Sequence, residues 1–159
     1  MYDSEAYQKC GSVDYRELGD FGGCGAPAVQ GSLQGDSGSS RELAVKKFVE
    51  SIPAAARLNL EAEHDFVDGL YLRTLAMPPE SVVVGKRHKL DHLFMVLKGS
   101  VTFADEMGVY TAFAGESFPV FAPCRRVLHA GPQGCVIMTV HPNPDNELDV
   151  RTLEARLVE

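Results

Sequence analysis

The hydrophobic and polar residues follow a two-residue period through most of the chain beyond residue 57. Leu58, Leu60 and Ala62 alternate with polar or charged residues, as in a strand with one buried face. Short apolar runs then follow, separated by glycine and proline at intervals of roughly ten residues. These runs are GLYLRTLAM, SVVV, HLFMVL, SVTFA, GVYTAF, SFPVFA, RVLHA and CVIMTVH. The pattern predicts a mainly β protein with an antiparallel sandwich or barrel over residues 54–143.

Two segments outside this region have the spacing of amphipathic helices. Residues 39–42 (SSRE) have the form of a capping box, and apolar residues then recur at helical spacing as far as Pro53. We therefore expect a helix within residues 40–53. Near the other end, Val150, Leu153 and Leu157 lie on one helical stripe. A second helix is predicted within residues 144–159.

The first 39 residues show neither period. Eight of the 15 glycines lie in residues 1–40, and residues 22–40 contain six glycines, four serines and a single charge. Such a stretch buries too little apolar surface to fold alone, so residues 1–39 are predicted to form an extended arm. An arm of this kind becomes ordered by docking on other subunits, and we expect a homo-oligomer.

Composition limits the partners that the chain would bind. The formal net charge of −7 argues against nucleic acid or an anionic membrane as the main partner. No apolar run approaches the ~20 residues that span a bilayer, and the sequence MYDSEAYQKC lacks the apolar core of a secretory signal. The four cysteines form no C-x-x-C pair and are expected to be free thiols in a reducing cytosol.

Four of the five histidines fall inside the predicted strand region: His88, His92, His129 and His141, the first two immediately before or within the run HLFMVL. Alternate residues of a strand share a face, so the even spacing of His88 and His92 directs both side chains into the barrel. An unpaired buried polar group costs about 1–3 kcal/mol, and a divalent metal would satisfy both rings. Imidazole suits zinc, copper, nickel and iron, and a third ligand from a later strand would complete a site.

The stretch GKRHKLDHLFMVLKGSV resembles the first motif of the cupin superfamily, whose members are small β-barrels of jelly-roll type. In that motif two histidines one residue apart are followed by a glutamate and, seven residues later, by a glycine. Counting back from Gly99, His92 stands at the place of the glutamate. His88 then matches the second histidine, and Lys86 occupies the place of the first.

The stretch AGESFPVFAPCRRVLHAG resembles the second cupin motif, with Gly115, Pro123 and His129 at the glycine, proline and histidine positions. It departs from the pattern at Cys124-Arg125, which replaces the usual loop glycine, and the interval from proline to histidine is one residue longer. The resemblance covers about residues 60–142. It implies a single cupin-type jelly-roll barrel, preceded by the arm and one helix and followed by another helix.

A closer likeness is to small cupin-like proteins encoded in tailed bacteriophage genomes. They share the GK-x-H-K-x-x-H core and a V-H-P strand end, which makes His141 a candidate third ligand beside His88 and His92. His129 competes with His141 for that position. The likeness leaves the biochemical role undefined, but together with the arm it favours a structural or assembly protein, found in a virion or in the host cytoplasm. Its arm, residues 1–39, would dock on neighbouring subunits or on other phage structural proteins.

Two other functions stay open, and so does the question whether the chain is an enzyme. In one, the histidines hold iron, zinc, manganese or nickel in a small cupin enzyme of oxygenase or isomerase type. In the other, the barrel binds a small ligand without metal. Arg125 and Arg126 flank the predicted barrel opening and could hold a carboxylate or a phosphate in a fork geometry.

The large apolar residues of the strand-like runs are expected in the core. They include Phe94, Met95, Phe103, Phe113, Phe118 and Phe121. His64 precedes most of these runs and is expected at the surface or in a turn.

Overall fold

The computed structural model describes residues 5–8, 47, 50, 57–105 and 108–159. Most of the predicted arm, residues 1–39, and most of the predicted helix within residues 40–53 lie outside the described residues. Lys47 and Glu50, the two described residues of that helix, are helical.

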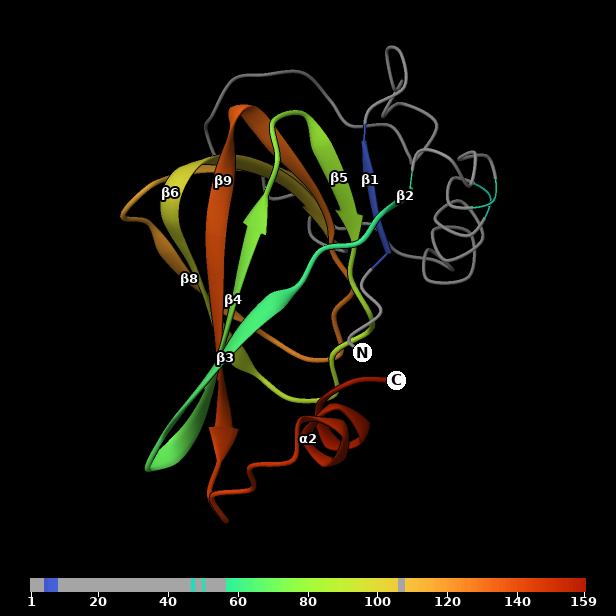
Figure 1. Ribbon diagram of the computed structural model, residues 1–159. Coiled ribbons are helices and arrows are strands. Elements are labelled where there is room, and N and C mark those ends of the chain that lie inside the picture. Colours follow the sequence, from blue (N-terminus) through green and yellow to red (C-terminus); the bar gives the residue numbers. More distant parts are fainter. Residues whose placement is uncertain (1–4, 9–46, 48–49, 51–56, 106–107) are drawn as a thin grey trace, which may run out of the picture.

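The described residues form one antiparallel sheet of nine strands and a closing helix, so the mainly β prediction is confirmed (Figure 1). The strands are β1 (Glu5–Gln8), β2 (Arg57–Leu58), β3 (Ala62–Val67), β4 (Gly69–Met77), β5 (Ser81–Val84), β6 (His92–Asp105), β7 (Gly108–Phe113), β8 (Ser117–Val120) and β9 (Val127–Asn143). The helix α2 spans Val150–Leu157.

Strand β9 organises the sheet because it pairs with β4, β5 and β6. Residues 127–129 of β9 pair with β5, and residues 135–143 pair with β4. Strand β6 follows β9 along much of its length and also pairs with β7 and β8. The sheet thereby curls around one apolar core, which includes Leu75, Phe94, Val96, Val101 and Ile137.

Strands β6 and β9 are each one long strand, although the glycines within them predicted two strands apiece. Strand β6 continues through Gly99, and β9 continues through Gly131 and Gly134. The register of β6 against β9 shifts on either side of residues 98 and 99, as at β-bulges. Bulges bend a strand without ending it, so these glycines mark bends in the barrel wall.

Two of the six apolar residues assigned to the core are at the surface, and a third, Met95, is half-buried in the outward phase of β6. Phe94 and Phe103 are buried as predicted, and Phe118 packs against the core. Phe113 is 59% exposed and Phe121 is 66% exposed, so the core prediction is wrong for both. Each directly follows a buried residue, and alternate strand positions point to opposite faces. The residue types in these apolar runs did not reveal which of the alternate positions face the core.

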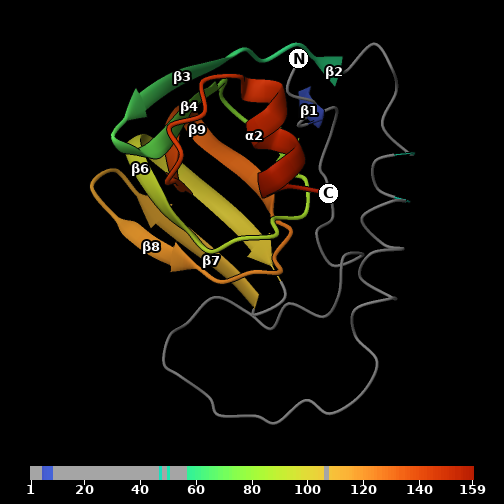
Figure 2. The same cartoon turned by 90° about the horizontal axis from the view of Figure 1, so that it is seen from below.

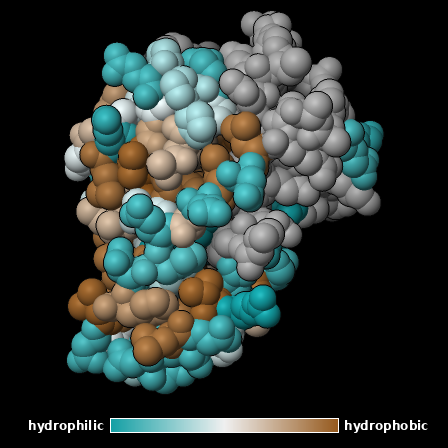
Figure 3. Space-filling model, in the orientation of Figure 1, coloured by the Kyte–Doolittle hydropathy of each residue, from teal (hydrophilic) through white to brown (hydrophobic). Residues whose placement is uncertain are grey.

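Apolar side chains also cover the outer face of the sheet. The outward residues of β4, β6 and β9 are Leu70, Leu72, Thr74, Ala76, Leu93, Met95, Leu97, Val136, Met138 and Val140. Figure 3 shows apolar residues in brown along the side of the molecule that carries β6 and β9. Along the neighbouring strand β3 the exposed residues include Glu63 and Asp65, so an acidic border flanks this apolar outer face.

The helix α2 forms within the predicted range and closes one end of the barrel (Figure 2). Asp149 caps it, accepting a hydrogen bond from the backbone N–H of Thr152 at 3.1 Å. Leu153 and Leu157 are buried against Tyr71 of β4. In the described part of the chain, no helix is long and apolar enough to cross a membrane.

Four residues of the predicted arm extend the sheet of their own chain. Strand β1 pairs with β5 through Glu5↔Val84 and Gln8↔Ser81, and with β2 on its other side. The docking of the arm on neighbouring subunits stays a prediction.

The two described cysteines are buried and form no disulfide, as predicted for free thiols. They are Cys124 and Cys135, whereas Cys10 and Cys24 lie outside the described residues. Burial raises the pKa of the Cys135 thiol to about 11. Cys135 is therefore a thiol at neutral pH, packed as a small apolar side chain.

We expect Gly99→Ala to destabilise the barrel by more than Gly69→Ala. Both glycines have a positive φ, +72° at Gly99 and +76° at Gly69, which costs an L residue about 1–2 kcal/mol. A Cβ at Gly99 would also collide with the carbonyl oxygen of Gly134, whereas a Cβ at Gly69 meets open space. Urea unfolding of both variants measures the difference, and equal losses of stability would contradict the close packing of the two bends.

Candidate metal centre

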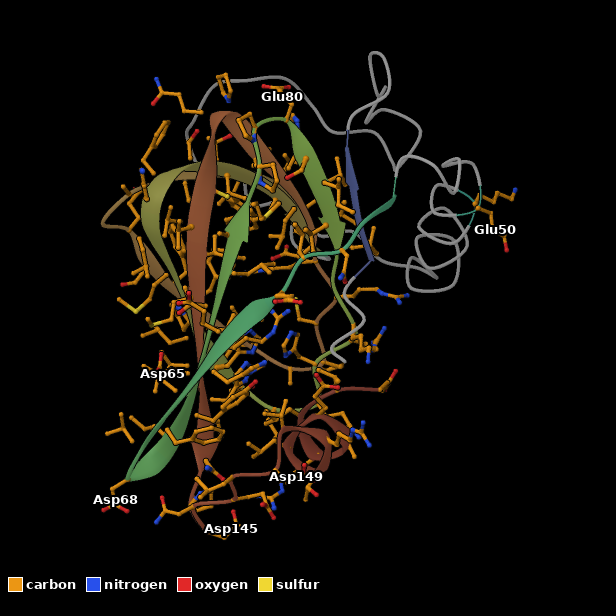
Figure 4. The ribbon with its side chains drawn as sticks, viewed as in Figure 1. Glu50, Asp65, Asp68, Glu80, Asp145 and Asp149 are labelled. Atoms are coloured by element: carbon orange, nitrogen blue, oxygen red, sulfur yellow. The ribbon has the colours of Figure 1, made fainter. Side chains whose placement is uncertain are left out.

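Three of the four strand histidines come together inside the barrel. His88, His92 and His141 each offer a ring nitrogen, and these nitrogens lie within 4.8 Å of one another. The ring centroids are 4.2 Å apart for His88 and His92, 4.6 Å for His92 and His141, and 5.3 Å for His88 and His141. This histidine cluster lies at the end of the barrel that α2 closes, where Figure 4 shows nitrogen-bearing side chains gathered between β4 and the helix.

Strand pairing turns His92 and His141 toward each other. His92 begins β6, one position beyond the cross-strand pair Leu93↔Val140, and His141 lies in β9. Both follow the inward phase of their strands: Phe94 and Thr139, two residues away, are buried as well. The exposed fraction is 8% for His92 and 2% for His141.

His88 is held by backbone hydrogen bonds from two directions. Its N–H donates to the carbonyl of Cys124 at 2.8 Å, in the loop before β9. On the other side the N–H of Lys89 donates to the carbonyl of Leu157 at 2.8 Å, and the N–H of Glu159 donates to the carbonyl of Arg87 at 3.0 Å. The segment that ends α2 therefore fixes the position of His88.

The ring nitrogens of the cluster have few partners. His92 Nδ1 lies 3.3 Å from the carbonyl oxygen of Leu90, to which a protonated Nδ1 would donate, leaving Nε2 as the ligand atom. Nδ1 of His88 and Nδ1 of His141 are buried, and no hydrogen-bond partner for either lies among the described residues. Buried, unpaired ring nitrogens of this kind fit a site that a metal ion or a small ligand completes.

Burial keeps all three imidazoles neutral at physiological pH. It lowers the pKa of His88 to about 3, of His92 to about 4 and of His141 to about 2. Neighbouring imidazoles lower the pKa of His88 and His141 further, as do the positive charges of Arg73 and, for His88, Arg126. A metal ligand must be a neutral imidazole, so the cluster is ready to bind without losing protons.

A small cavity of about 50 Å³ opens beside the cluster. His88 and His92 line it, and its remaining walls are mainly apolar, from Leu75, Phe94, Val120, Leu128 and Ile137. One water needs roughly 10–15 Å³ of such space, so the cavity has room for a few waters or a ligand of a few heavy atoms.

The structure places His129 apart from the cluster. Its Nε2 lies 3.4 Å from the carboxylate of Glu80, which Figure 4 labels at the end of the barrel opposite α2. His129 and His141 have even spacing, but they are twelve positions apart, a span of about 40 Å along a strand, so a shared face does not bring them together. Of the two candidates for the third position, His141 is the one that joins His88 and His92.

The two candidate arginines differ in position. Arg125 Nε donates to the carbonyl of Gly85 at 3.0 Å, and Arg125 is not among the residues that line the cavity. Arg126 lines the cavity and pairs with Asp105, with Nη2 3.1 Å from Oδ2. Only Arg126 therefore reaches the neighbourhood of the histidines.

Sequence reasoning missed three residues around the cluster. Arg73 on β4 is only 8% exposed and lines the cavity. Tyr71 lies opposite His141 in the register, and its ring stacks on those of His64 and His141. His64, expected at the surface or in a turn, lies in strand β3 and is half-buried, with Nδ1 2.7 Å from the Tyr71 hydroxyl. The alternation of the strands could have revealed these residues. Tyr71 and Arg73 occupy inward positions of β4, and His64 shares the inward face of β3 with Ala62 and Phe66.

No family model and no curated protein matches the sequence. Solved structures are similar in fold. A cupin domain of an XRE-family transcriptional regulator from Enterobacter cloacae is 7% identical, with 54% of this chain and 100% of that one covered and a TM-score of 0.47. A cupin superfamily protein from Desulfitobacterium hafniense is 10% identical, with 53% and 77% covered and a TM-score of 0.45.

A cupin 2 conserved barrel domain protein from Salinispora arenicola is 13% identical, with 62% of this chain and 85% of that one covered and a TM-score of 0.47. At these identities the likeness is one of fold alone. The fold and the site together define a small antiparallel β-barrel with a cluster of three histidines at one end that could bind a metal ion.

The metal-free protein is expected to lose stability as the pH falls from about 7 toward 4. An unfolded chain protonates its imidazoles near pH 6.5, whereas the three histidines of the fold have pKa values of about 3, 4 and 2. In this window the unfolded state binds more protons, so each histidine lowers the free energy of unfolding by at most about 1.4 kcal/mol per pH unit.

Urea unfolding at several pH values, with a chelator present, measures this slope. His92→Gln removes one titrating ring and should make the slope shallower. Stability that rises on acidification through this window would contradict the buried, neutral cluster.

Proposed function

We propose that the protein is a cupin-type metal-binding barrel in which His88, His92 and His141 hold one divalent transition metal. The observation that carries the proposal is the convergence of three imidazoles, two buried and one half-buried, whose ring nitrogens lie within 4.8 Å of one another. Because the pKa values of His88 and His141 are low, these imidazoles are neutral and can bind a metal. Their Nδ1 atoms have no hydrogen-bond partner among the described residues and are available as ligand atoms.

The donor set narrows the choice of metal. No carboxylate of the described chain joins the three rings, and imidazole suits iron, zinc and nickel, whereas manganese favours oxygen ligands. Three protein ligands leave coordination positions open, as in catalytic sites, whereas a closed set of four is typical of structural zinc. A metal in such a site acts as a Lewis acid or lowers the pKa of bound water.

The surrounding residues support an enzymatic use of such a centre. The cavity beside the cluster has room for a substrate of a few heavy atoms, and most of its walls are apolar. The carbonyl of Leu90 orients the ring of His92, and the backbone around His88 is fixed on both sides. We therefore favour a small metal-dependent cupin enzyme.

Metal binding tests the proposal directly. We expect the purified protein, dialysed against zinc, nickel or iron(II), to retain about one metal per chain by elemental analysis. His88→Ala, His92→Ala and His141→Ala should each weaken binding by at least about 100-fold, because each removes a ligand.

His129→Ala is the matched control, because it removes a strand histidine that lies outside the cluster, and it should bind metal like the wild type. Wild-type protein that retains no metal would overturn the proposal. So would metal that is lost equally in the His129 variant.

A second function, assembly, is favoured by the apolar outer face of β4, β6 and β9. We propose that a second copy of the chain covers it. The face holds no charged side chain between its acidic border on β3 and Lys98, and sheets pack face to face in β-sandwiches. Seven residues of strand and four to five neighbouring strands span about 24 Å by 20 Å. The flat area of this face is about 500 Å², and its accessible surface is larger because side chains project from it. It is of the order of the ~800 Å² that each partner buries in a stable interface.

The resemblance to phage-encoded cupin-like proteins supports the same candidate, as does the glycine- and serine-rich arm. In this proposal the barrel is a rigid body of a virion or another assembly, or of a complex in the host cytoplasm. Residues 1–39 add contacts with neighbouring subunits or other phage structural proteins. Assembly and metal binding use different surfaces and are compatible.

We expect Met138→Lys to weaken self-association by at least about tenfold, because it places a charge in the centre of the apolar outer face. Light scattering over a range of concentrations measures the mass. Val109→Lys, at an exposed position on β7 beyond the bend at Gly99, is the control and should associate like the wild type. Deleting residues 1–38 tests the arm separately. A monomeric wild type would overturn the assembly proposal.

A further inference from the structure

Three positively charged side chains share the cavity with the histidines. Arg73, Lys86 and Arg126 line it, and the lining residues include no aspartate or glutamate. Arg73 is 8% exposed, and the side chain of Arg126 is 13% exposed. All the charged side chains that line the cavity are therefore cations, and a negatively charged ligand would suit it.

The guanidinium of Arg126 is held in a fixed plane. Nε and Nη2 both lie 3.1 Å from Oδ2 of Asp105, so this carboxylate occupies one edge of the fork. The guanidinium carbon lies 4.4 Å from the ring centroid of Phe103 and 5.3 Å from that of Phe94. Ion pair and aromatic rings together remove the freedom that an arginine side chain usually has.

The remaining nitrogen of this guanidinium is a donor without an acceptor. Nη1 of Arg126 is buried, and the described residues offer it no hydrogen-bond partner. An arginine stays protonated in proteins, so Nη1 remains a hydrogen-bond donor that needs an acceptor. A buried unpaired donor is costly, and a bound acceptor would remove that cost.

A second buried polar atom lies in the wall of the same cavity. Thr139 is 8% exposed, lines the cavity, and has a hydroxyl with no hydrogen-bond partner in the described part of the chain. It pairs with Arg73 across β9 and β4, and its neighbour on the same face of β9 is His141. Thr139 thus connects the cationic wall to the histidine cluster.

We infer that this cavity binds a small aliphatic carboxylate, with Arg126 Nη1 and the Thr139 hydroxyl as donors to its oxygens. Two free donors, one of them on a guanidinium whose other edge is fixed by Asp105, match a planar monoanion, whereas a phosphate dianion would need more donors. The apolar walls suit a short hydrocarbon body, and the volume of about 50 Å³ limits it to a few heavy atoms. The inference names a ligand class for the proposed metal centre. Binding of the carboxylate by Arg126 and Thr139 does not require the metal, whereas its role as a ligand of that centre rests on the proposed function.

Propionate is the probe for the test, with propionamide as the neutral match and inorganic phosphate as the alternative anion. Calorimetric titration of the full chain, both metal-free and zinc-loaded, should show one saturable propionate site. Propionamide and phosphate should bind at least about tenfold more weakly, because one lacks the charge and the other lacks enough donors.

Two variants locate the site. Thr139→Val removes one donor with little change of shape and should weaken propionate binding by about threefold to tenfold. Arg126→Gln combined with Asp105→Asn removes the cation together with its buried partner, so that no uncompensated carboxylate remains, and should weaken binding by at least about tenfold. Arg125→Gln is the control, because Arg125 does not line the cavity, and it should bind propionate like the wild type.

The outcomes separate the two proposals. Wild-type affinity for propionate in both the Thr139 variant and the double variant would overturn the inference, as would equal binding of propionamide. If zinc binds and propionate does not, the ligand class fails while the metal centre stands. If propionate binds through Arg126 but no metal is retained, the metal centre fails and the carboxylate site stands.

Discussion

The antiparallel pairing of β9 with β4 and β6 is the constraint on which the rest of the structure depends. It puts Tyr71 opposite His141 and aligns the start of β6 with the same end of β9, so two ligands of the histidine cluster face each other. The same strand carries Thr139 into the wall of the cavity. A slip of one residue in this register would replace His141 by Val140 on the inner face and remove the site.

Burial gives the site its chemical character. Three imidazoles and two guanidinium groups lie in or beside an apolar cavity, and their mutual proximity favours neutral histidines. The fold therefore holds polar groups that contribute little to its own stability. Asp105 neutralises the charge of Arg126 by forming an ion pair with it. Other buried polar atoms have no hydrogen-bond partner in the described chain; they belong to His88, His141, Thr139 and Arg126. Unsatisfied groups concentrated at one place are typical of a site that is completed by something it binds.

Much of this arrangement could be predicted from the sequence, and the exceptions have physical reasons. The two-residue period identified the β class. His88 and His92 were expected to share a face of one strand, but His88 lies before β6, in an isolated bridge to Cys124 and Val158, so tertiary pairing rather than even spacing brings it to the cluster. The choice between His129 and His141 needed the length of β9, because parity along a strand does not reveal which end of a barrel a residue reaches. Phe113 and Phe121 resembled core residues by type, but only the neighbouring buried positions reveal the phase. Arg73 could have been found as a charge at an inward position of an apolar strand. The position of α2 beneath His88 depends on tertiary pairing that no local pattern encodes.

The support of His88 by the segment after α2 separates the lifetime of a bound ion from the stability of the barrel. A helix of eight residues anchored by Leu153 and Leu157 opens at a lower free energy than a sheet of nine strands. Each such opening releases the backbone around His88 while His92 and His141 keep their places in the sheet. The residence time of anything that His88 helps to hold is therefore governed by local fraying at one edge of the molecule, and exchange can proceed while the rest of the chain remains folded.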